Sequence, residues 1–282
     1  MFLSNKFLEN KLVSLLVVGC ALVFSLEGCG GGGSGNASET APPAGSGGTA
    51  GTAPKLYVGY YVEDAVNNPE DPTIGNLMVK IPSGDGTFAG LMPFSYLGCI
   101  AGADVGRVSG TRSGVSLNGT WSGTVDNVAV GGTYQGTHTP SSDTFSGNYT
   151  NTGGKVRFGT GACFGFVAAT GTWKIFGTTT SEPSTFVATA TAGNTPTISW
   201  PSAGAGTRYG VRVFDEDCLN VNPSNAACFN GEAFTNGTTI QFPAQFQNAV
   251  PLNSGGHYLV LLTGQNLSTG ALLAFSSLRV LP

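Results

Sequence analysis

From residue 55 to its end, the chain consists of short apolar runs separated by Gly, Asn, Asp and Pro. No segment places apolar residues at positions i, i+3, i+4 and i+7 over several turns, which is the pattern of an amphipathic helix. Short apolar runs between turn residues are instead typical of β-strands. The 44 glycines and the charged fraction of 10% also argue against long helices, because glycine disfavours helix interiors and exposed helices carry many charges. We therefore predict an all-β protein.

Residues 55–177 are predicted to form a first domain, an antiparallel meander with a barrel-like shape. A hairpin signal, Ser83-Gly84-Asp85-Gly86, joins two of its expected strands. We expect the strands of this domain at residues 56–62, 77–81, 87–96, 115–125, 130–138, 144–150, 156–158 and 163–176.

Aromatic residues of this domain recur beside glycine, as in Gly119-Thr120-Trp121 and Gly132-Thr133-Tyr134. The simplest interpretation is that the glycine lets neighbouring strands approach closely while the ring fills the interior. The alternative is that Trp121, Tyr134 and Trp173 contact a ligand, either by stacking on sugars or by lining a barrel cavity. In these tripeptides the segment resembles the small β-barrels of surface lipoproteins, such as the transferrin-binding-protein family.

Residues 185–282 are predicted to form a second domain, in which two sheets pack face to face. Alternate residues of its strands share one face, as Tyr258, Val260 and Leu262 do. The spacing of Leu252 and Tyr258 resembles the tyrosine corner of fibronectin type III domains. The resemblance implies a fibronectin type III-like β-sandwich, although that family has no counterpart of the segment between residues 218 and 228. The expected strands are residues 185–190, 195–200, 209–214, 238–242, 257–263 and 275–280.

Residues 1–28 have the organisation of a signal peptide, with two lysines before an apolar run at residues 12–26. This run is shorter than the roughly 20 residues that a membrane-spanning helix needs. The tetrapeptide Leu26-Glu27-Gly28-Cys29 resembles the lipobox of bacterial lipoproteins, apart from Glu27, where a small or apolar residue is usual. The resemblance implies cleavage before Cys29 and its acylation, palmitate included, so that the N-terminal lipid holds the protein on the membrane.

Two alternatives to lipidation at Cys29 remain: a competing lipobox that ends at Cys20, and an ordinary secreted protein without lipid. Gly30 differs from the Asp that follows the lipidated Cys in inner-membrane lipoproteins of enteric bacteria, so we expect the outer membrane, with its periplasmic or surface face left open. Residues 29–54 are then the lipidated Cys and a flexible Gly, Ser, Ala and Pro tether. A linker is expected at residues 178–184.

Four cysteines remain once Cys20 and Cys29 are set aside, and four allow three pairings. The domain boundaries favour Cys99 with Cys163 and Cys218 with Cys228. Disulfides fit a protein of the envelope, which is an oxidising environment. Metal binding is the alternative, but the chain has no Cys-x-x-Cys and no His close to a Cys in the sequence.

Little in the sequence points to catalysis. His138 and His257 are the only histidines, and both are expected to be solvated. No Gly-x-Ser-x-Gly motif is present, and Gly154-Lys155 is not followed by the Ser or Thr of a phosphate-binding loop. A net charge of −4 without a cluster of Lys or Arg argues against nucleic acid as a partner. We therefore predict a protein that is not an enzyme and that has no cofactor and no metal.

Two acidic loops bear on this interpretation. Residues 63–71 and 215–217 could supply paired carboxylates to a glycan hydrolase. Both loops also have the oxygen-rich spacing of a weak calcium site, but neither fits an EF-hand; in the second loop Leu219 takes the fifth position. Solvated turn residues are the simpler interpretation for the four residues of this possible cation loop, which are Asp215, Asp217, Asn220 and Asn222.

Together these observations predict a non-enzymatic, outer-membrane-anchored binding or spacer module of the cell envelope. Its partner would be an envelope protein or a glycan that the sequence does not identify. The alternatives are a small barrel carrier or carbohydrate-binding protein that uses the Gly-x-aromatic residues, and a glycan hydrolase that uses the acidic loops. We also expect the loop closed by Cys218 and Cys228 to be a contact surface for a partner.

Overall fold

The computed structural model describes residues 53–64, 74–94, 104–125, 128–151, 170–247 and 249–282. Strands dominate these residues, and the one α-helix among them, α1, spans Glu216–Val221. The predicted all-β fold is therefore confirmed. Among the same residues, no helix is long and apolar enough to cross a membrane.

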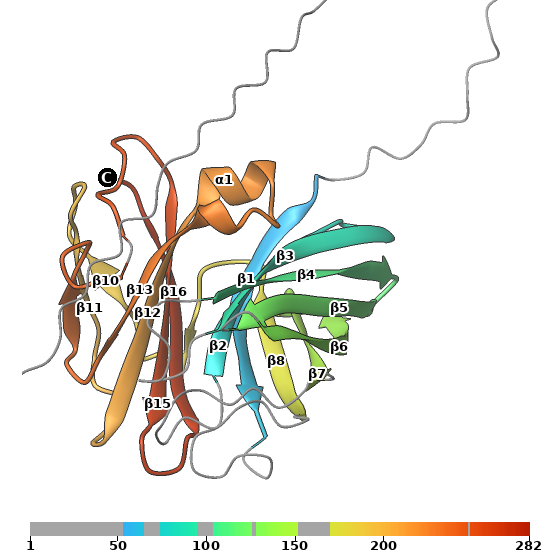
Figure 1. The fold of residues 1–282 in the computed structure, drawn as a ribbon, viewed down its shortest axis with the longest axis horizontal. Helices are drawn as coiled ribbons and strands as arrows, with labels where there is room; N and C mark the ends of the chain where they lie inside the picture. Colours follow the sequence, from blue (N-terminus) through green and yellow to red (C-terminus); the bar gives the residue numbers. More distant parts are fainter. Residues whose placement is uncertain (1–52, 65–73, 95–103, 126–127, 152–169, 248) are drawn as a thin grey trace, which may run out of the picture. The chain divides into compact units, whose positions relative to one another are not determined.

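The first eight strands form a closed antiparallel barrel, in which β1 pairs with both β2 and β8 (Figure 1). Every strand pairs with its neighbour in the chain, as expected for a meander. The strands are β1 (Lys55–Glu63), β2 (Ile74–Ile81), β3 (Gly86–Phe94), β4 (Asp104–Ser113), β5 (Ser116–Val125), β6 (Val128–Thr139), β7 (Thr144–Asn151) and β8 (Thr170–Phe176).

The remaining strands form two sheets: a three-stranded sheet in the order β10-β11-β14 and a five-stranded sheet in the order β13-β12-β15-β16-β9. Helix α1 and a 3₁₀ turn, η1 (Ala226–Cys228), lie between β12 and β13. The strands are β9 (Ser181–Glu182), β10 (Thr189–Ala190), β11 (Thr197–Ser199), β12 (Thr207–Asp215), β13 (Phe229–Thr235), β14 (Thr239–Gln241), β15 (Tyr258–Asn266) and β16 (Leu272–Val280).

Three strands were not expected from the sequence. In β4 the residues that face the barrel interior are Gly106, Val108 and Gly110, so this face carries a single apolar side chain. The alternation of apolar and polar residues is therefore too weak to predict a strand. Strand β13 carries a buried Glu232 within its row, which interrupts the pattern in the same way. Strand β9 lies within the residues assigned to the linker and pairs with β16. The strand expected at residues 156–158 lies outside the described residues.

Glycine and aromatic residues face each other across neighbouring barrel strands. Gly119 pairs with Tyr134 and Gly132 pairs with Trp121. A Cβ atom on Gly119 would lie 2.6 Å from Tyr134 Oη, and one on Gly132 would lie 2.6 Å from Trp121 Nε1. The ring therefore covers the glycine on the next strand, which explains why glycine and aromatic residues alternate in the sequence. The same relation holds for Gly75 with Tyr61, Gly110 with Phe88, and Gly171 with Tyr149.

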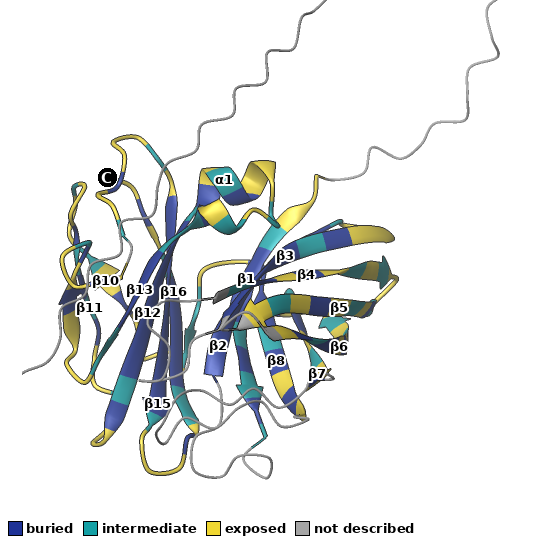
Figure 2. Cartoon of the chain, in the orientation of Figure 1, coloured by how far each residue is buried: buried dark blue, intermediate teal, exposed yellow. Residues whose placement is uncertain are grey.

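The five-stranded sheet is buried on both faces, and Figure 2 shows its strands β12 and β15 as almost continuously buried. One face packs on the three-stranded sheet through Tyr258, Val260 and Leu262, as the sequence predicted. The other face, with Leu259 and Leu261, packs in one cluster with barrel residues of β1, β2, β3 and β8. The sheet is thus the middle layer between the barrel and the three-stranded sheet.

A buried ion pair lies where the barrel meets the five-stranded sheet. Arg212 Nε of β12 donates to Glu232 Oε2 of β13 at 3.2 Å, and the two side chains are 1% and 3% exposed. Arg212 Nη1 also donates to Asn76 Oδ1 of β2 at 2.7 Å, and Asn76 Nδ2 donates to the Gly59 carbonyl at 3.1 Å. A charged network therefore joins β1 and β2 of the barrel to the sheet.

Candidate functional site

The two halves of the barrel wall have different outer surfaces. On β1–β3 the outward row contains the buried apolar residues Val58, Met78 and Leu91, which pack in one cluster with residues of the five-stranded sheet. On β5–β7 buried and exposed residues alternate along each strand, as Figure 2 shows. This exposed half of the wall is where the described part of the barrel can meet another molecule.

Two rows of polar side chains run across the exposed wall. The first, which we call the amide row, consists of Asn118, Gln135 and Asn148, which are register partners on β5, β6 and β7. Thr111 of β4 and Thr172 of β8 continue this row at its two ends. The second, which we call the hydroxyl row, consists of Ser109, Thr120, Thr133, Thr150 and Thr170 in the same strand order.

A groove with a volume of about 340 Å³ lies between the two rows. The amide row forms one wall, and Thr133 and Thr150 of the hydroxyl row form the other. Gly119, Tyr134 and Tyr149 lie between the rows in register and form the floor. The wall residues are exposed, as expected from the alternation of side chains along a strand, whereas Tyr134 and Tyr149 of the floor direct their side chains to the barrel interior.

The walls of the groove carry uncharged amide and hydroxyl side chains. Thr133 Oγ1 and Thr150 Oγ1 hydrogen bond to each other at 2.8 Å, which fixes this wall. Within the described part of the chain, the side-chain amides of Asn118, Gln135 and Asn148 make no hydrogen bond to protein groups. Each amide therefore offers both donors and an acceptor to a ligand.

The three aromatic residues considered as ligand contacts lie in the barrel core. Trp121, Tyr134 and Trp173 are 4%, 8% and 3% exposed. Tyr134 and Trp173 meet edge to face with ring centroids 5.8 Å apart, and Trp173 Nε1 donates to the Asn148 carbonyl at 3.1 Å. Burial raises the pKa of the Tyr134 hydroxyl. Contact between these rings and a ligand stays a prediction: Tyr134 is part of the groove floor, whereas Trp121 and Trp173 do not line the groove.

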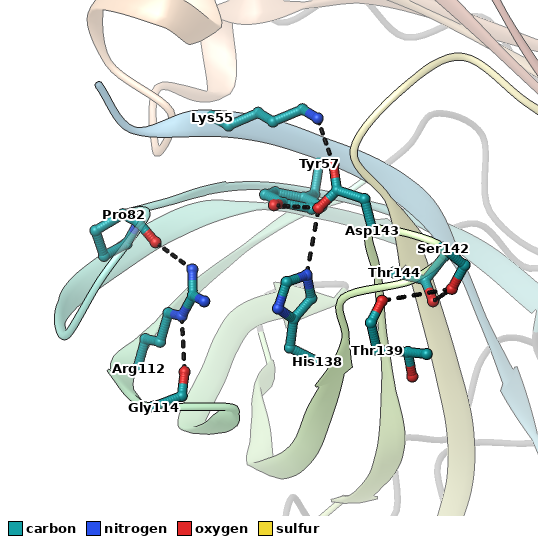
Figure 3. A network of polar contacts seen from close by, with 10 residues as sticks. All are labelled: Lys55, Tyr57, Pro82, Arg112, Gly114, His138, Thr139, Ser142, Asp143 and Thr144. Carbon is teal, nitrogen blue, oxygen red and sulfur yellow. Dashed lines mark hydrogen bonds and ion pairs between the residues drawn. The ribbon is translucent and has the colours of Figure 1, made fainter. Parts of the chain in front are cut away.

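A second polar cluster lies at one end of the barrel, around the Asp143 carboxylate in the β6–β7 hairpin (Figure 3). Asp143 Oδ1 accepts from Tyr57 Oη at 2.9 Å and contacts His138 Nε2 at 3.3 Å, while Oδ2 accepts from Lys55. Although partial burial by itself raises the pKa of Asp143, the hydrogen bonds from Lys55, Tyr57 and His138 outweigh it and hold this pKa below its ordinary value. Burial and the bond to Asp143 raise the pKa of Tyr57 to about 12. The cluster ties the start of β1 to the hairpin.

His138 is less exposed than the sequence suggested, with 12% of its side chain accessible. Its ring stacks on Phe145 with centroids 4.3 Å apart. Ser142, the nearby hydroxyl in Figure 3, bonds to Thr144 at 2.8 Å, and no bond between Ser142 and His138 is present among the described residues. Among the residues that the structure describes, the His138–Asp143 pair therefore has no hydroxyl nucleophile bonded to the imidazole, as triad chemistry would need. His257 is exposed as expected and bonds to Asp217 at 2.9 Å.

The predicted disulfide between Cys218 and Cys228 is confirmed. It links α1 to η1, and Cys228 is fully buried against barrel and sheet residues. Lys80 of β2 donates to the Asn220 carbonyl, and Arg107 Nε of β4 donates to the Ser224 carbonyl at 3.2 Å. The loop that we expected to meet a partner is thus braced against the barrel of its own chain.

The residues of the possible cation loop have local partners. Asp215 caps α1 by accepting from the Cys218 N–H at 2.8 Å, and Asp217 binds His257. Asn222 Oδ1 accepts from the Ser224 N–H at 3.2 Å. Among the described residues, no group of three or more His, Cys, Asp or Glu side chains is arranged to hold a metal ion.

Several predicted site residues lie outside the described residues: Cys29, Cys99, Cys163, and Glu70 and Asp71 of the first acidic loop. Glu63 of that loop is buried at the end of β1. The sequence analysis singled out Tyr134, which lies in the floor of the groove, but none of the residues of its walls. The available signal was the run of Thr, Asn and Gln at alternate positions of β5, β6 and β7, opposite the Gly and aromatic residues.

Comparison with known proteins gives no relative for this chain. No family model, no curated protein and no solved structure matches it. Its class is therefore defined by its own fold: an all-β protein with a closed eight-stranded antiparallel barrel and two further sheets.

Proposed function

We propose that this protein is a lipid-anchored binding module of the bacterial cell envelope, that it is not an enzyme, and that the exposed half of the barrel wall is its binding surface. One observation carries the proposal. The five-stranded sheet covers one half of the barrel, while the other half is exposed, polar and hollowed by a groove. The two sheets then act as a structural support that packs on the covered half of the barrel, and the tether at residues 29–54 connects the protein to the membrane.

The filled interior supports binding at the outer wall rather than transport inside the barrel. Tyr61, Phe88, Trp121, Tyr134 and Trp173 belong to one core cluster. A carrier barrel needs an enclosed cavity for its cargo. The volume of the described groove instead lies between outward-facing side chains.

We further propose that residues 185–282 form a fibronectin type III-like sandwich. Leu252 and Tyr258 are both buried, and the Asn253 N–H donates to Tyr258 Oη at 2.9 Å. A tyrosine hydroxyl that bonds to backbone a few residues upstream is the defining contact of a tyrosine corner. The contact supports the resemblance inferred from the sequence.

Anchoring is tested by palmitate labelling of Cys29→Ser, Cys20→Ser and double-variant cells. Label and membrane association should be lost with Cys29→Ser and kept with Cys20→Ser. If Cys29→Ser alone keeps both, the lipid is attached elsewhere and the anchor proposal fails. A chain that is unlabelled in every case would be an ordinary secreted protein.

Binding at the exposed wall is tested in cells by photo-cross-linking with p-benzoylphenylalanine in place of Thr120, in the hydroxyl row. The matched control carries the same group in place of Thr239, an exposed residue of the three-stranded sheet. An adduct at position 120 and none at position 239 supports the proposal. Equal labelling, or none at either position, contradicts it. Hydrolysis of polysaccharides that is lost in Glu70→Gln or Asp71→Asn would overturn the non-enzyme assignment.

A further inference from the structure

The groove has the shape of a track that crosses several strands. The amide and hydroxyl rows each take one residue from every strand between β4 and β8. The groove itself is lined by residues of β5, β6 and β7, and neighbouring strands are about 4.8 Å apart, so it spans two strand spacings, or roughly 10 Å. The two rows are separated by about 6.7 Å, the distance between residues i and i+2 of a strand. Because both rows continue onto β4 and β8 beyond the groove, an extended polymer can contact more of their side chains than a compact small molecule can.

The hydrogen-bonding groups of the walls define the chemistry of that polymer. Asn118, Gln135 and Asn148 present donors and acceptors side by side, and Thr133 and Thr150 present hydroxyl and methyl groups. Vicinal hydroxyl groups of a sugar can donate and accept at once, so they match side-chain amides well. No charged side chain lines the groove among the described residues. An anionic chain would find no cation there, and a lipid chain would leave the polar walls unsatisfied.

The closed barrel argues against a peptide as the ligand. Extended peptides commonly bind by adding a strand to an open sheet edge. Strands β4 to β8 are each paired on both sides, so their backbone groups are already used. Recognition at this surface must come from the side chains, and these suit hydroxyl groups.

We infer that the groove between the amide row and the hydroxyl row binds a segment of a neutral polysaccharide chain. The inference rests on the proposed function of the exposed wall and adds the class of ligand. Because Thr133 and Thr150 already bond to each other, one wall is ordered before binding, which lowers the entropic cost.

Affinity electrophoresis of the full-length lipoprotein tests this inference, with dextran, laminarin or galactomannan in native gels. The protein is solubilised in Triton X-100, because a sugar-based detergent would compete. At least one of these polysaccharides should retard the wild type. The double variant Asn118→Ala/Gln135→Ala should raise Kd at least about tenfold, equivalent to about 1.4 kcal/mol.

The matched control is Thr124→Ala/Thr137→Ala, which removes exposed side chains from the same two strands outside the groove. Its Kd should stay within about twofold of the wild type. Equal retardation of the Asn118→Ala/Gln135→Ala variant would show that the groove is not the site. Stronger retardation by polygalacturonate than by any neutral chain would overturn the assignment of a neutral ligand.

The cross-linking experiment distinguishes failure of the proposed binding function from failure of the proposed ligand class. A protein adduct at position 120 together with no retardation by any polysaccharide overturns the ligand class and leaves the binding function intact. Absence of both the adduct and the retardation removes the binding function as well.

Discussion

The buried pair Arg212–Glu232 allows a sharp test of how the barrel is attached to the five-stranded sheet. In Arg212→Met, Glu232 keeps its charge in a site where its side chain is 3% exposed, and Asn76 Oδ1 loses a donor at 2.7 Å. Removing one partner of a buried ion pair costs about 3–5 kcal/mol, because the remaining charge is not compensated. For a folded unit of this size, each kcal/mol lowers Tm by about 2–4 °C. We therefore expect Tm to fall by about 6–20 °C.

Urea unfolding followed by far-UV circular dichroism measures this loss directly. The double variant Arg212→Met/Glu232→Leu should recover at least about 1.5 kcal/mol relative to the single variant, because no unpaired charge remains. Arg208→Met is the matched control, since Arg208 lies partly exposed on the same strand. The guanidinium groups of Arg208 and Arg212 lie 5.3 Å and 5.6 Å from the centre of the Phe234 ring. The control variant should cost about 1 kcal/mol or less. A loss below about 1 kcal/mol for Arg212→Met, or a double variant no more stable than the single one, would refute the reasoning.

Three further predictions concern stability. Gly132→Ala should lower the free energy of unfolding by about 1–3 kcal/mol or more, since the new Cβ would lie 1.8 Å from the Thr150 carbonyl oxygen. Gly84→Ala, whose Cβ would have no atom within 4 Å, should change it by less than about 0.5 kcal/mol, and equal unfolding midpoints for the two variants would contradict this prediction. The Asp143 carboxylate has a lowered pKa in the folded state, so its contribution to the free energy of unfolding is complete above the ordinary pKa of 3.8 and disappears as pH falls through the folded pKa. The difference in Tm between wild type and Asp143→Asn should therefore shrink below about pH 4, and a difference that grows there would contradict the predicted direction. Cys218→Ser/Cys228→Ser should lower the free energy of unfolding by about 2–4 kcal/mol in the same urea assay. An unchanged midpoint would mean that the contacts of this loop with the barrel do not depend on the disulfide.

Much of the local structure could be read from the sequence. Alternation of Gly or aromatic residues with Thr, Asn or Ser predicted β5, β6 and β7 close to their observed bounds, because one face of each strand is buried and the other is exposed. The pairing of Cys218 with Cys228 followed from the predicted domain boundaries, which place both cysteines in the second domain. The contact between Tyr258 and residues near Leu252 was likewise local.

Only the tertiary structure showed how the strands close into a barrel and which layers of the protein pack on one another. Barrel closure pairs Val58 with Phe176, and the link between Arg212 and Asn76 spans 136 residues. Such contacts depend on the fit of two surfaces that no local pattern encodes. The sequence gives one indication of this outcome, because β1 carries apolar residues on both faces and β7 does not. A strand that is apolar on both faces must be covered on both. Long-range packing alone decides which layer covers it, and therefore which half of the barrel stays exposed with its groove.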